Sequence, residues 1–134
     1  MATKGDIIQF LQDEFPQFLY TIDFVGDKKS SLRHSPSAED LRPGGTLSGP
    51  ALFGLADAAL YVAILGEIGI VALAVTTNIN INFLRKPSAN HDLIARCTLI
   101  KVGKTLAVGE VSLYSEGQDA PIAHAVGTYA IPRQ

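Results

Sequence analysis

One carboxylate lies in the middle of the most apolar stretch of the chain, residues 48–65. Asp57 is the only charged residue in that stretch, which is long enough for several helical turns. A carboxylate is costly to bury unless it has a partner or a chemical role. A helix that begins at Ser48 and Gly49 also offers free backbone N–H groups and the positive end of its dipole. An acid together with amide donors can perform general-base or nucleophilic chemistry at a polarised carbonyl.

Each of these residues also has a structural interpretation. Ser48 is a favoured helix N-cap, and the Gly-x-Ser-x-Gly elbow typical of nucleophilic serines is absent from the sequence. Asp57 could be the partner of a buried ion pair, although its mid-helix position excludes a capping role. The three histidines, His34, His91 and His124, do not have the spacing of metal ligands, so we expect no metal site.

The separation of the two candidate groups predicts a shared site. Gly49 and Asp57 are eight residues apart, which places them about 12 Å apart along one helix at 1.5 Å per residue. Two antiparallel copies of the helix would bring Gly49 of one subunit to Asp57 of the other. We therefore expect a required homodimer, and a dimer of dimers is compatible with the same pattern. Tyr61, one turn after Asp57, would lie on the same face and orient the reacting group or water.

The composition predicts one globular domain over residues 1–134, with 47% hydrophobic and 18% charged residues. A net charge of -2 argues against a broad nucleic-acid surface. The single cysteine, Cys97, cannot form an internal disulfide, which favours a cytoplasmic location. Acidic residues interrupt residues 1–20, so no signal peptide is expected. The apolar run 49–65 contains Asp57 and falls short of the roughly 20 residues of a membrane span, so we expect no membrane insertion.

The hydrophobic periodicity predicts an α+β fold, in which an antiparallel sheet wraps around the long central helix. Before that helix we expect an amphipathic helix at 4–14 ended by Phe15-Pro16, strands at 18–25 and 29–34, and a loop over 35–47. After it we expect a four-strand antiparallel meander, with strands at 70–84, 93–102, 106–114 and 121–131. In the first of these strands, alternate residues from Val71 to Phe83 form an apolar face, and Asn78, Asn80 and Asn82 lie on the other. Gly109 indicates a bulge.

Three segments are similar to motifs of a known family. Gly45-Thr46-Leu47-Ser48-Gly49-Pro50, followed by Leu55-Ala56-Asp57, is similar to Gly-x-x-His-Gly-Gly followed by Leu-Ala-Asp. The strand end Asn80-Ile81-Asn82-Phe83-Leu84-Arg85-Lys86-Pro87 is similar to Asn-x-x-Phe-Leu-Arg-Pro, and Gly103-Lys104 to a Gly-Arg/Lys hairpin. Over residues 20–131 the chain thus resembles the hotdog-fold acyl-CoA thioesterases, in particular the PaaI-like and 4-hydroxybenzoyl-CoA types. Ser48 and Pro50 stand where the family has His and Gly, and Arg42 where some members have Asn.

The resemblance implies hydrolysis of an acyl-CoA with a medium-chain or aromatic acyl group. No cofactor is implied, because coenzyme A is part of the substrate. The Gly49 amide would polarise the thioester carbonyl, with Ser48 beside it, and Asp57 would act as base or nucleophile. Arg85, Lys86 and Lys104 would line the exit for the nucleotide of coenzyme A. Arg42 is an additional cation for its phosphates, and Asn82 could lie near the ligand or a subunit contact.

Three other functions stay open at this point. Because Ser48 and Pro50 replace the family's His and Gly, the chain could bind an acyl-CoA or fatty ligand without catalysis. A hotdog-type hydratase would need a histidine paired with an acid near the start of the central helix, and we expect none of the three histidines there. A dimeric scaffold without a small ligand would not explain the lone carboxylate Asp57.

Overall fold

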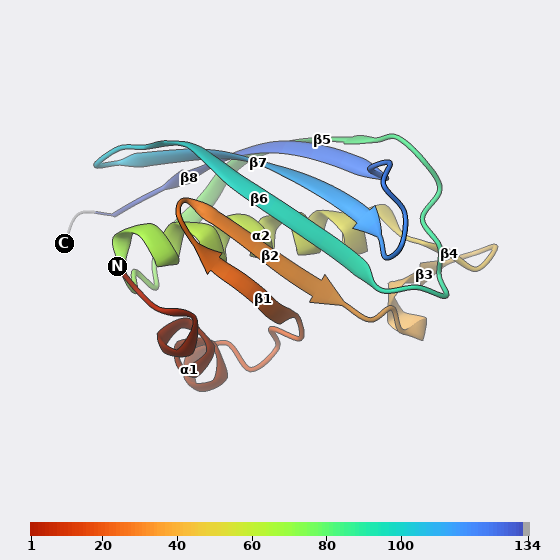
Figure 1. Cartoon of the computed structure of the whole chain (residues 1–134), viewed down its shortest axis with the longest axis horizontal. Coiled ribbons are helices and arrows are strands. Elements are labelled where there is room, and N and C mark those ends of the chain that lie inside the picture. The colour runs from red at the N-terminus through yellow and green to blue at the C-terminus, as the bar shows by residue number, and fades with distance from the viewer. Residues whose placement is uncertain (133–134) are drawn as a thin grey trace.

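A long helix lies against one face of an antiparallel sheet in the computed structural model, which describes residues 1–132. Figure 1 shows helix α2 (Gly49–Ile68) running under the curved sheet, whose strand order is β1-β2-β6-β7-β8-β5. The strands are β1 (Thr21–Gly26), β2 (Lys29–His34), β5 (Val75–Phe83), β6 (Leu93–Val102), β7 (Leu106–Ser115) and β8 (Ala123–Ala130). This arrangement is the hotdog fold and confirms the predicted α+β architecture.

Helix α2 forms the core, as its all-round apolar sequence predicts. The Ser48 hydroxyl caps the helix by accepting the Ala51 N–H at 3.2 Å, and Pro50 occupies the first turn, where no N–H is needed. Gly69 ends the helix with a φ of 96°, a conformation that favours glycine. Most residues from Leu52 to Gly66 are buried. By length and composition α2 could cross a membrane, but 67% of its apolar window is buried within this fold.

Two glycines let α2 approach the sheet closely. Gly109 of β7 and Gly127 of β8 lie opposite each other in the antiparallel register. The two methyl groups of Leu60 pack against this pair. A Cβ added at Gly127 would lie 2.5 Å from Leu60 Cδ1, and one at Gly109 would lie 2.8 Å from Leu60 Cδ2. No side chain fits at either position unless α2 or its neighbours move.

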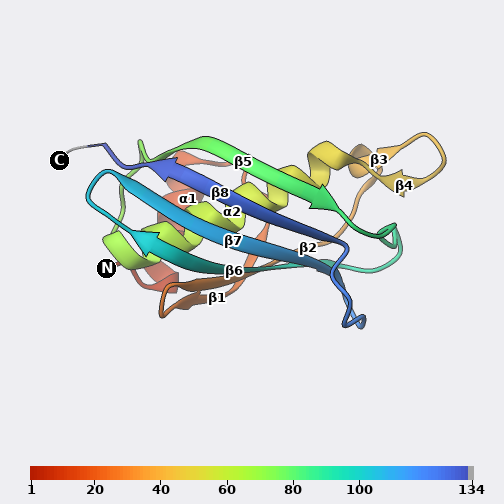
Figure 2. The ribbon, with the colours of Figure 1, turned by 90° about the horizontal axis from the view of Figure 1, so that it is seen from above.

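The strand order corrects the predicted meander, because β5 pairs with β8 and not with β6. Of the four strands after α2, only β6, β7 and β8 pair in sequence order as hairpin neighbours. The connection over residues 84–92 is far longer than a hairpin turn and crosses the end of the sheet (Figure 2). As a result β5 forms one edge of the sheet and β1 the other.

The predicted apolar strand face and the predicted bulge at Gly109 both need correction. The register of β5 against β8 shifts between Thr76 and Asn78, so Thr76 faces α2, and Val75 and Thr77 are exposed. The predicted apolar face is therefore right for the half-buried Ile79 and Ile81 and for Phe83, whose ring lies against Gly49 of α2, but not for Val75 and Thr77. Val71 is buried, but it lies before the strand begins. The second register shift is between Leu99 and Lys101 of β6. The bulge predicted at Gly109 therefore lies in the strand opposite Gly109, and not in β7. An extra residue in one strand of a pair reverses the alternation on one side of the bulge.

Before α2, helix α1 (Lys4–Glu14) and strand β2 have their predicted extents, whereas β1 begins three residues later than predicted, at Thr21. Helix α1 begins with a reciprocal capping box between Thr3 and Asp6, and it buries Ile7 and Leu11. Figures 1 and 2 place α1 on the side of α2 that faces away from the sheet. The expected loop at 35–47 contains the short turns and strands η1 (Ala38–Asp40), β3 (Leu41–Arg42) and β4 (Thr46–Leu47).

Candidate active site

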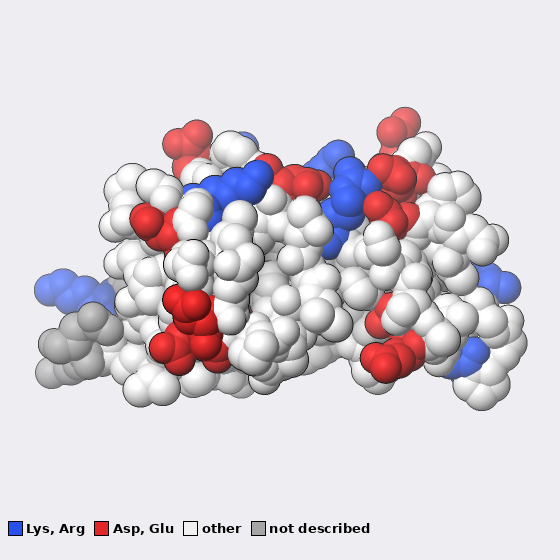
Figure 3. Space-filling view, turned by 90° about the horizontal axis from the view of Figure 1, so that it is seen from below, with Lys and Arg blue, Asp and Glu red and all other residues white. Residues whose placement is uncertain are grey.

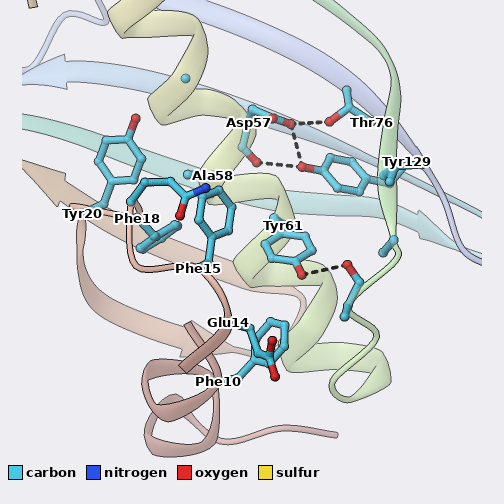
Figure 4. A pocket seen from close by; sticks show the side chains of 15 residues that line it. Phe10, Glu14, Phe15, Phe18, Tyr20, Asp57, Ala58, Tyr61, Thr76 and Tyr129 are labelled. Atoms are coloured by element: carbon cyan, nitrogen blue, oxygen red, sulfur yellow. Dashed lines mark hydrogen bonds between the residues drawn. The ribbon is translucent and has the colours of Figure 1, made fainter. Parts of the chain in front are cut away.

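Two hydroxyl groups from different strands hold the Asp57 carboxylate. Its Oδ1 accepts hydrogen bonds from Thr76 Oγ1 in β5 and from the Tyr129 hydroxyl in β8, both at 2.6 Å. The Tyr129 hydroxyl also lies 3.2 Å from the Asp57 carbonyl oxygen (Figure 4). Within residues 1–132 no hydrogen bond uses the second carboxylate oxygen, Oδ2. One oxygen is therefore oriented by the fold and the other remains available.

The tyrosines beside Asp57 are buried and neutral. Burial, and then the hydrogen bond to Asp57, raise the pKa of Tyr129 well above its ordinary value of 10. Tyr129 therefore keeps its proton at neutral pH and donates a hydrogen bond to the carboxylate. Burial also raises the pKa of Tyr61, whose hydroxyl donates to the Ala72 carbonyl at 3.3 Å. The Tyr61 and Tyr129 rings stack with their centroids 6.1 Å apart.

A cavity of about 600 Å³ opens beside Asp57 and Thr76. Helix α2 contributes Asp57, Ala58 and Tyr61 to one wall, while α1 and the segment after it contribute aromatic rings to the facing wall. The volume is that of a typical small-molecule site, and the lining is mostly apolar with a few polar groups. An apolar group attached to a reacting carbonyl could be accommodated here.

The start of α2 lies away from this carboxylate within one chain. The Ser48 hydroxyl is engaged in capping, and the Ser48 N–H donates to the Asp40 carbonyl at 2.8 Å. Gly49 is half-buried beside the Phe83 ring, 3.4 Å from the place where a Cβ would be. Since Gly49 and Asp57 lie on the same helix, a protomer alone does not bring the candidate amide and the acid together.

The predicted substrate-binding residues are dispersed. Tyr61 lines the cavity with Asp57, whereas the other five do not. Arg42, Asn82 and Lys86 are exposed, and the guanidinium of Arg85 donates to the Pro121 carbonyl at 2.6 Å. Figure 3, a view from the α1 side, shows uncharged surface between separate groups of acidic and basic side chains.

Lys104 lies far from the other predicted cations within a protomer. It is in the β6–β7 hairpin beside Ile68 and Val71, at the C-terminal end of α2. Arg85 follows β5 at the end where that strand reaches the start of α2. The three cations expected to line one exit thus occupy opposite ends of the helix.

Thr76 and Tyr129 are site residues that the sequence analysis missed. The alternation in 70–84 assigned Thr77, not Thr76, to the helix-facing side, because the bulge could not be foreseen. Tyr129 is a buried tyrosine in a strand of mostly small residues, Ala123–Ala130. A tyrosine hydroxyl buried in a core needs a hydrogen-bond partner, and this requirement was the one available signal.

One histidine does lie near the start of α2, contrary to the expectation from sequence. His34 Nε2 is 2.8 Å from Asp40 Oδ2, and the Asp40 carbonyl accepts the N–H of Ser48. The pairing of β2 and the fold of the 35–47 loop create this contact. The His34–Asp40 pair does not line the cavity that contains Asp57. The described residues contain no group of three or more His, Cys, Asp or Glu residues placed to hold a metal ion.

Comparison with known proteins identifies the family. A sequence profile described as the thioesterase superfamily matches residues 44–122, more than half of the chain. The chain belongs to the thioesterase superfamily. This thioesterase is also similar to a solved candidate thioesterase from Silicibacter sp. TM1040, with 42% identity, a TM-score of 0.89, and coverage of 98% of this chain and 93% of that chain. A search of curated proteins finds no match.

More distant solved structures share the fold of this thioesterase. The Escherichia coli PaaI protein from the phenylacetic acid degradation operon has 24% identity and a TM-score of 0.78, with 91% of both chains covered. A Streptococcus mutans protein solved with bound acetyl CoA has 20% identity and a TM-score of 0.72, covering 86% of this chain and 91% of that chain. The resemblance inferred from the sequence motifs is thus confirmed, and the chain is a thioester hydrolase of hotdog fold.

Proposed function

We propose that this thioesterase hydrolyses an acyl-CoA with a medium-chain or aromatic acyl group to the free acid and coenzyme A. The observation that carries the proposal is the Asp57 carboxylate, oriented through Oδ1 by Thr76 and Tyr129, with Oδ2 available beside an apolar cavity. The acetyl CoA bound to the structurally similar Streptococcus mutans protein supports coenzyme A esters as the substrate class.

Asp57 acts in one of two ways in this proposal. As a general base it takes a proton from water, which attacks the thioester carbonyl. As a nucleophile it attacks that carbonyl itself, forming an anhydride that water then hydrolyses. In both routes the carbon–sulfur bond breaks and the thiolate of coenzyme A leaves. An amide at the start of α2, that of Gly49, polarises the carbonyl and stabilises the oxyanion.

The Gly49 amide comes from a second subunit. Strand β5 is a sheet edge with unpaired backbone groups, and apolar side chains are exposed along it and along α2. Phe53 of α2 is 40% exposed, and Val75 and Phe83 of β5 are 53% and 54% exposed. A second copy that covers this edge and helix face, with its α2 antiparallel, brings Gly49 to the partner subunit's Asp57. We therefore propose a homodimer with two shared sites.

The same antiparallel arrangement explains the dispersed cations. It places the C-terminal end of one α2 on the same side as the N-terminal end of the other. Lys104 of one subunit then approaches the side on which Arg85 and Lys86 of its partner lie. We propose that these cations, with Arg42, bind the phosphates of coenzyme A outside the apolar cavity.

Replacement of the acid tests the proposal. Asp57→Asn keeps the size of the side chain and removes the base, so we expect kcat for acyl-CoA hydrolysis to fall about 10²- to 10⁴-fold. Release of coenzyme A is measured with a thiol reagent, and circular dichroism checks the fold. Asp119→Asn, in an exposed turn, is the matched control and should retain wild-type activity. Wild-type turnover by folded Asp57→Asn would show that the catalytic assignment is wrong.

The alternative of a non-catalytic binding module gives a different result. Wild-type protein would then bind acyl-CoA tightly in calorimetry and release no coenzyme A from any ester in a broad panel. The oriented Asp57 carboxylate favours catalysis over this alternative, because a cavity that only binds an apolar acyl chain gains nothing from a carboxylate held beside it.

A further inference from the structure

We propose that the N-terminal segment, residues 4–20, forms the acyl-binding wall of this site and selects apolar acyl groups without a terminal charge. The proposal rests on the proposed acyl-CoA hydrolysis and names the part of the chain that determines the acyl group. The segment consists of α1, the Phe15-Pro16 corner and the residues that lead into β1.

The segment presents an aromatic wall to the cavity. Phe10, Phe15, Phe18 and Tyr20 line it across from Asp57 and Ala58 (Figure 4). Phe18 contacts Phe15 and Tyr20 edge to face, with ring centroids 5.9 and 5.1 Å apart. An acyl chain whose carbonyl lies at Asp57 would extend between these rings and Tyr61. Apolar and aromatic groups gain both burial and edge-to-face contacts in such a space.

The charges of the cavity exclude a carboxylate at the far end of the acyl group. Glu14, the last residue of α1, lines the cavity together with Asp57, so two carboxylates face this space. The described lining residues include no Lys or Arg. A dicarboxylic monothioester would bring a third negative charge into this space without a cation to pair with it. Neutral acyl groups carry no such penalty.

The wall can be altered without disturbing the rest of the core. Helix α1 is anchored through Ile7 and Leu11, which are buried and do not line the cavity. Phe15 is 37% exposed and Phe18 is half-buried. Truncation of these two side chains to alanine should therefore enlarge the cavity while α1 remains packed against the core.

The first experiment measures kcat/KM for a series of straight-chain and aromatic acyl-CoAs with Phe15→Ala and Phe18→Ala. For the best wild-type substrate we expect a loss of about 10-fold or more, with the preference moving to bulkier acyl groups, and acetyl-CoA changed less than about 2-fold. Phe24→Ala is the matched control, because Phe24 is 47% exposed on β1 and outside the cavity. If Phe18→Ala fails to fold, Phe15→Ala alone decides the outcome. An unchanged acyl profile in the folded variants would overturn the proposal.

The second experiment uses glutaryl-CoA against a neutral acyl-CoA of the same carbon number. Glu14→Gln should raise kcat/KM for glutaryl-CoA about 10-fold relative to the neutral ester, since one cavity charge is removed. Asp13→Asn is the control, because the Asp13 carboxylate does not line the cavity and accepts hydrogen bonds from the Gln9 side-chain amide on the exposed face of α1. Equal ratios in wild type and Glu14→Gln would contradict the charge argument.

The two proposals fail in different ways. If hydrolysis depends on Asp57 but substitutions in residues 4–20 do not change the preference among acyl groups, only the proposed acyl-binding wall is wrong. If the wild-type protein releases coenzyme A from no ester, the proposed function fails and the inference that rests on it fails too.

Discussion

The carboxylate of Asp57 depends on two neutral donors that lie 19 and 72 residues further along the chain. A hydrogen bond to a charged group contributes about 1.5–3 kcal/mol, so each donor can hold the carboxylate in one orientation. In the proposed mechanism Thr76 and Tyr129 are positioning residues that act through Asp57, and their contribution should appear in kcat more than in KM.

Removal of either hydroxyl tests this role. We expect Tyr129→Phe and Thr76→Val each to lower kcat about 10- to 100-fold, as loss of one such hydrogen bond predicts, with KM changed little. Thr76→Ser keeps the hydroxyl and should recover most of the activity. Steady-state kinetics with one acyl-CoA measures all three variants. A loss confined to KM, or no recovery with Thr76→Ser, would contradict positioning of the acid.

The buried tyrosines also predict the behaviour of the protein in alkali. The folded protein keeps the Tyr129 proton above pH 10, where the unfolded chain loses it, so the unfolded state binds fewer protons. The free energy of unfolding should then fall by up to about 1.4 kcal/mol per pH unit above pH 10 from this group. Urea titrations from pH 8 to 11 measure the slope. Tyr129→Phe should have a shallower slope, and an equal slope in both proteins would show that Tyr129 does not cause it.

Residues whose position follows from nearby sequence were predictable. Asp57, Tyr61 and the cap Ser48 lie within four helical turns of one another, so spacing alone places them. Thr76 and Tyr129 reach Asp57 only through the β5–β8 pairing and the β5 bulge. Neither long-range register nor a bulge leaves a local pattern in one sequence.

At the scale of elements, the contact between α2 and the sheet depends on the Gly109–Gly127 pair. A methyl group at residue 127 would overlap Leu60 Cδ1 at 2.5 Å and lie 3.0 Å from Ile79 Cγ1. Overpacking of a core costs about 1–3 kcal/mol. The separation of helix and sheet therefore depends on these two glycines.

Gly127→Ala should destabilise the protein by about 1–3 kcal/mol and move α2 away from the sheet. Thermal and urea unfolding measure the loss. Gly5→Ala in α1 is the control, because its nearest atom, Thr3 Oγ1, is 3.9 Å from the added Cβ. That variant should be neutral or stabilising by up to about 1 kcal/mol. Equal stability of the two variants would show that the close approach is not required.

Helices and strands whose ends are marked by caps, turns and periodicity were predicted at the correct positions. Helix α1 and strand β6 have the predicted ends, and α2 extends three residues beyond the apolar run, to Ile68. Their caps, turns and periodicity are contained in each segment. The predicted pairing of β5 with β6 was wrong. Strand order depends on where the long connection after β5 crosses the sheet, and the sequence of the strand itself does not determine this.

At the scale of the molecule, a shared site can be tested by mixing inactive subunits. Gly49→Pro removes the amide N–H at the first helical position, where proline is tolerated, and Gly49→Ala keeps it. Gly49→Pro and Asp57→Asn should each be inactive as homodimers. After the two variants are unfolded and refolded together in equal amounts, about half of the dimers should be mixed, and each mixed dimer contains one intact site of two. The sample should therefore recover about a quarter of wild-type activity.

Gly49→Ala provides the control for added bulk next to Phe83 and should retain activity. Light scattering verifies the dimer in each sample. Absence of recovery in proven mixed dimers would show that each site is built within one subunit.

The position of α1 also has an evolutionary consequence. The family profile covers residues 44–122, and α1 with its aromatic rings precedes that range. Asp57, Thr76 and Gly49 all fall inside it. Exchange of the first 20 residues between related enzymes should therefore change which acyl groups are accepted and leave the proposed catalytic residues in place. Substrate range could then diverge in evolution without any change in the chemistry of hydrolysis.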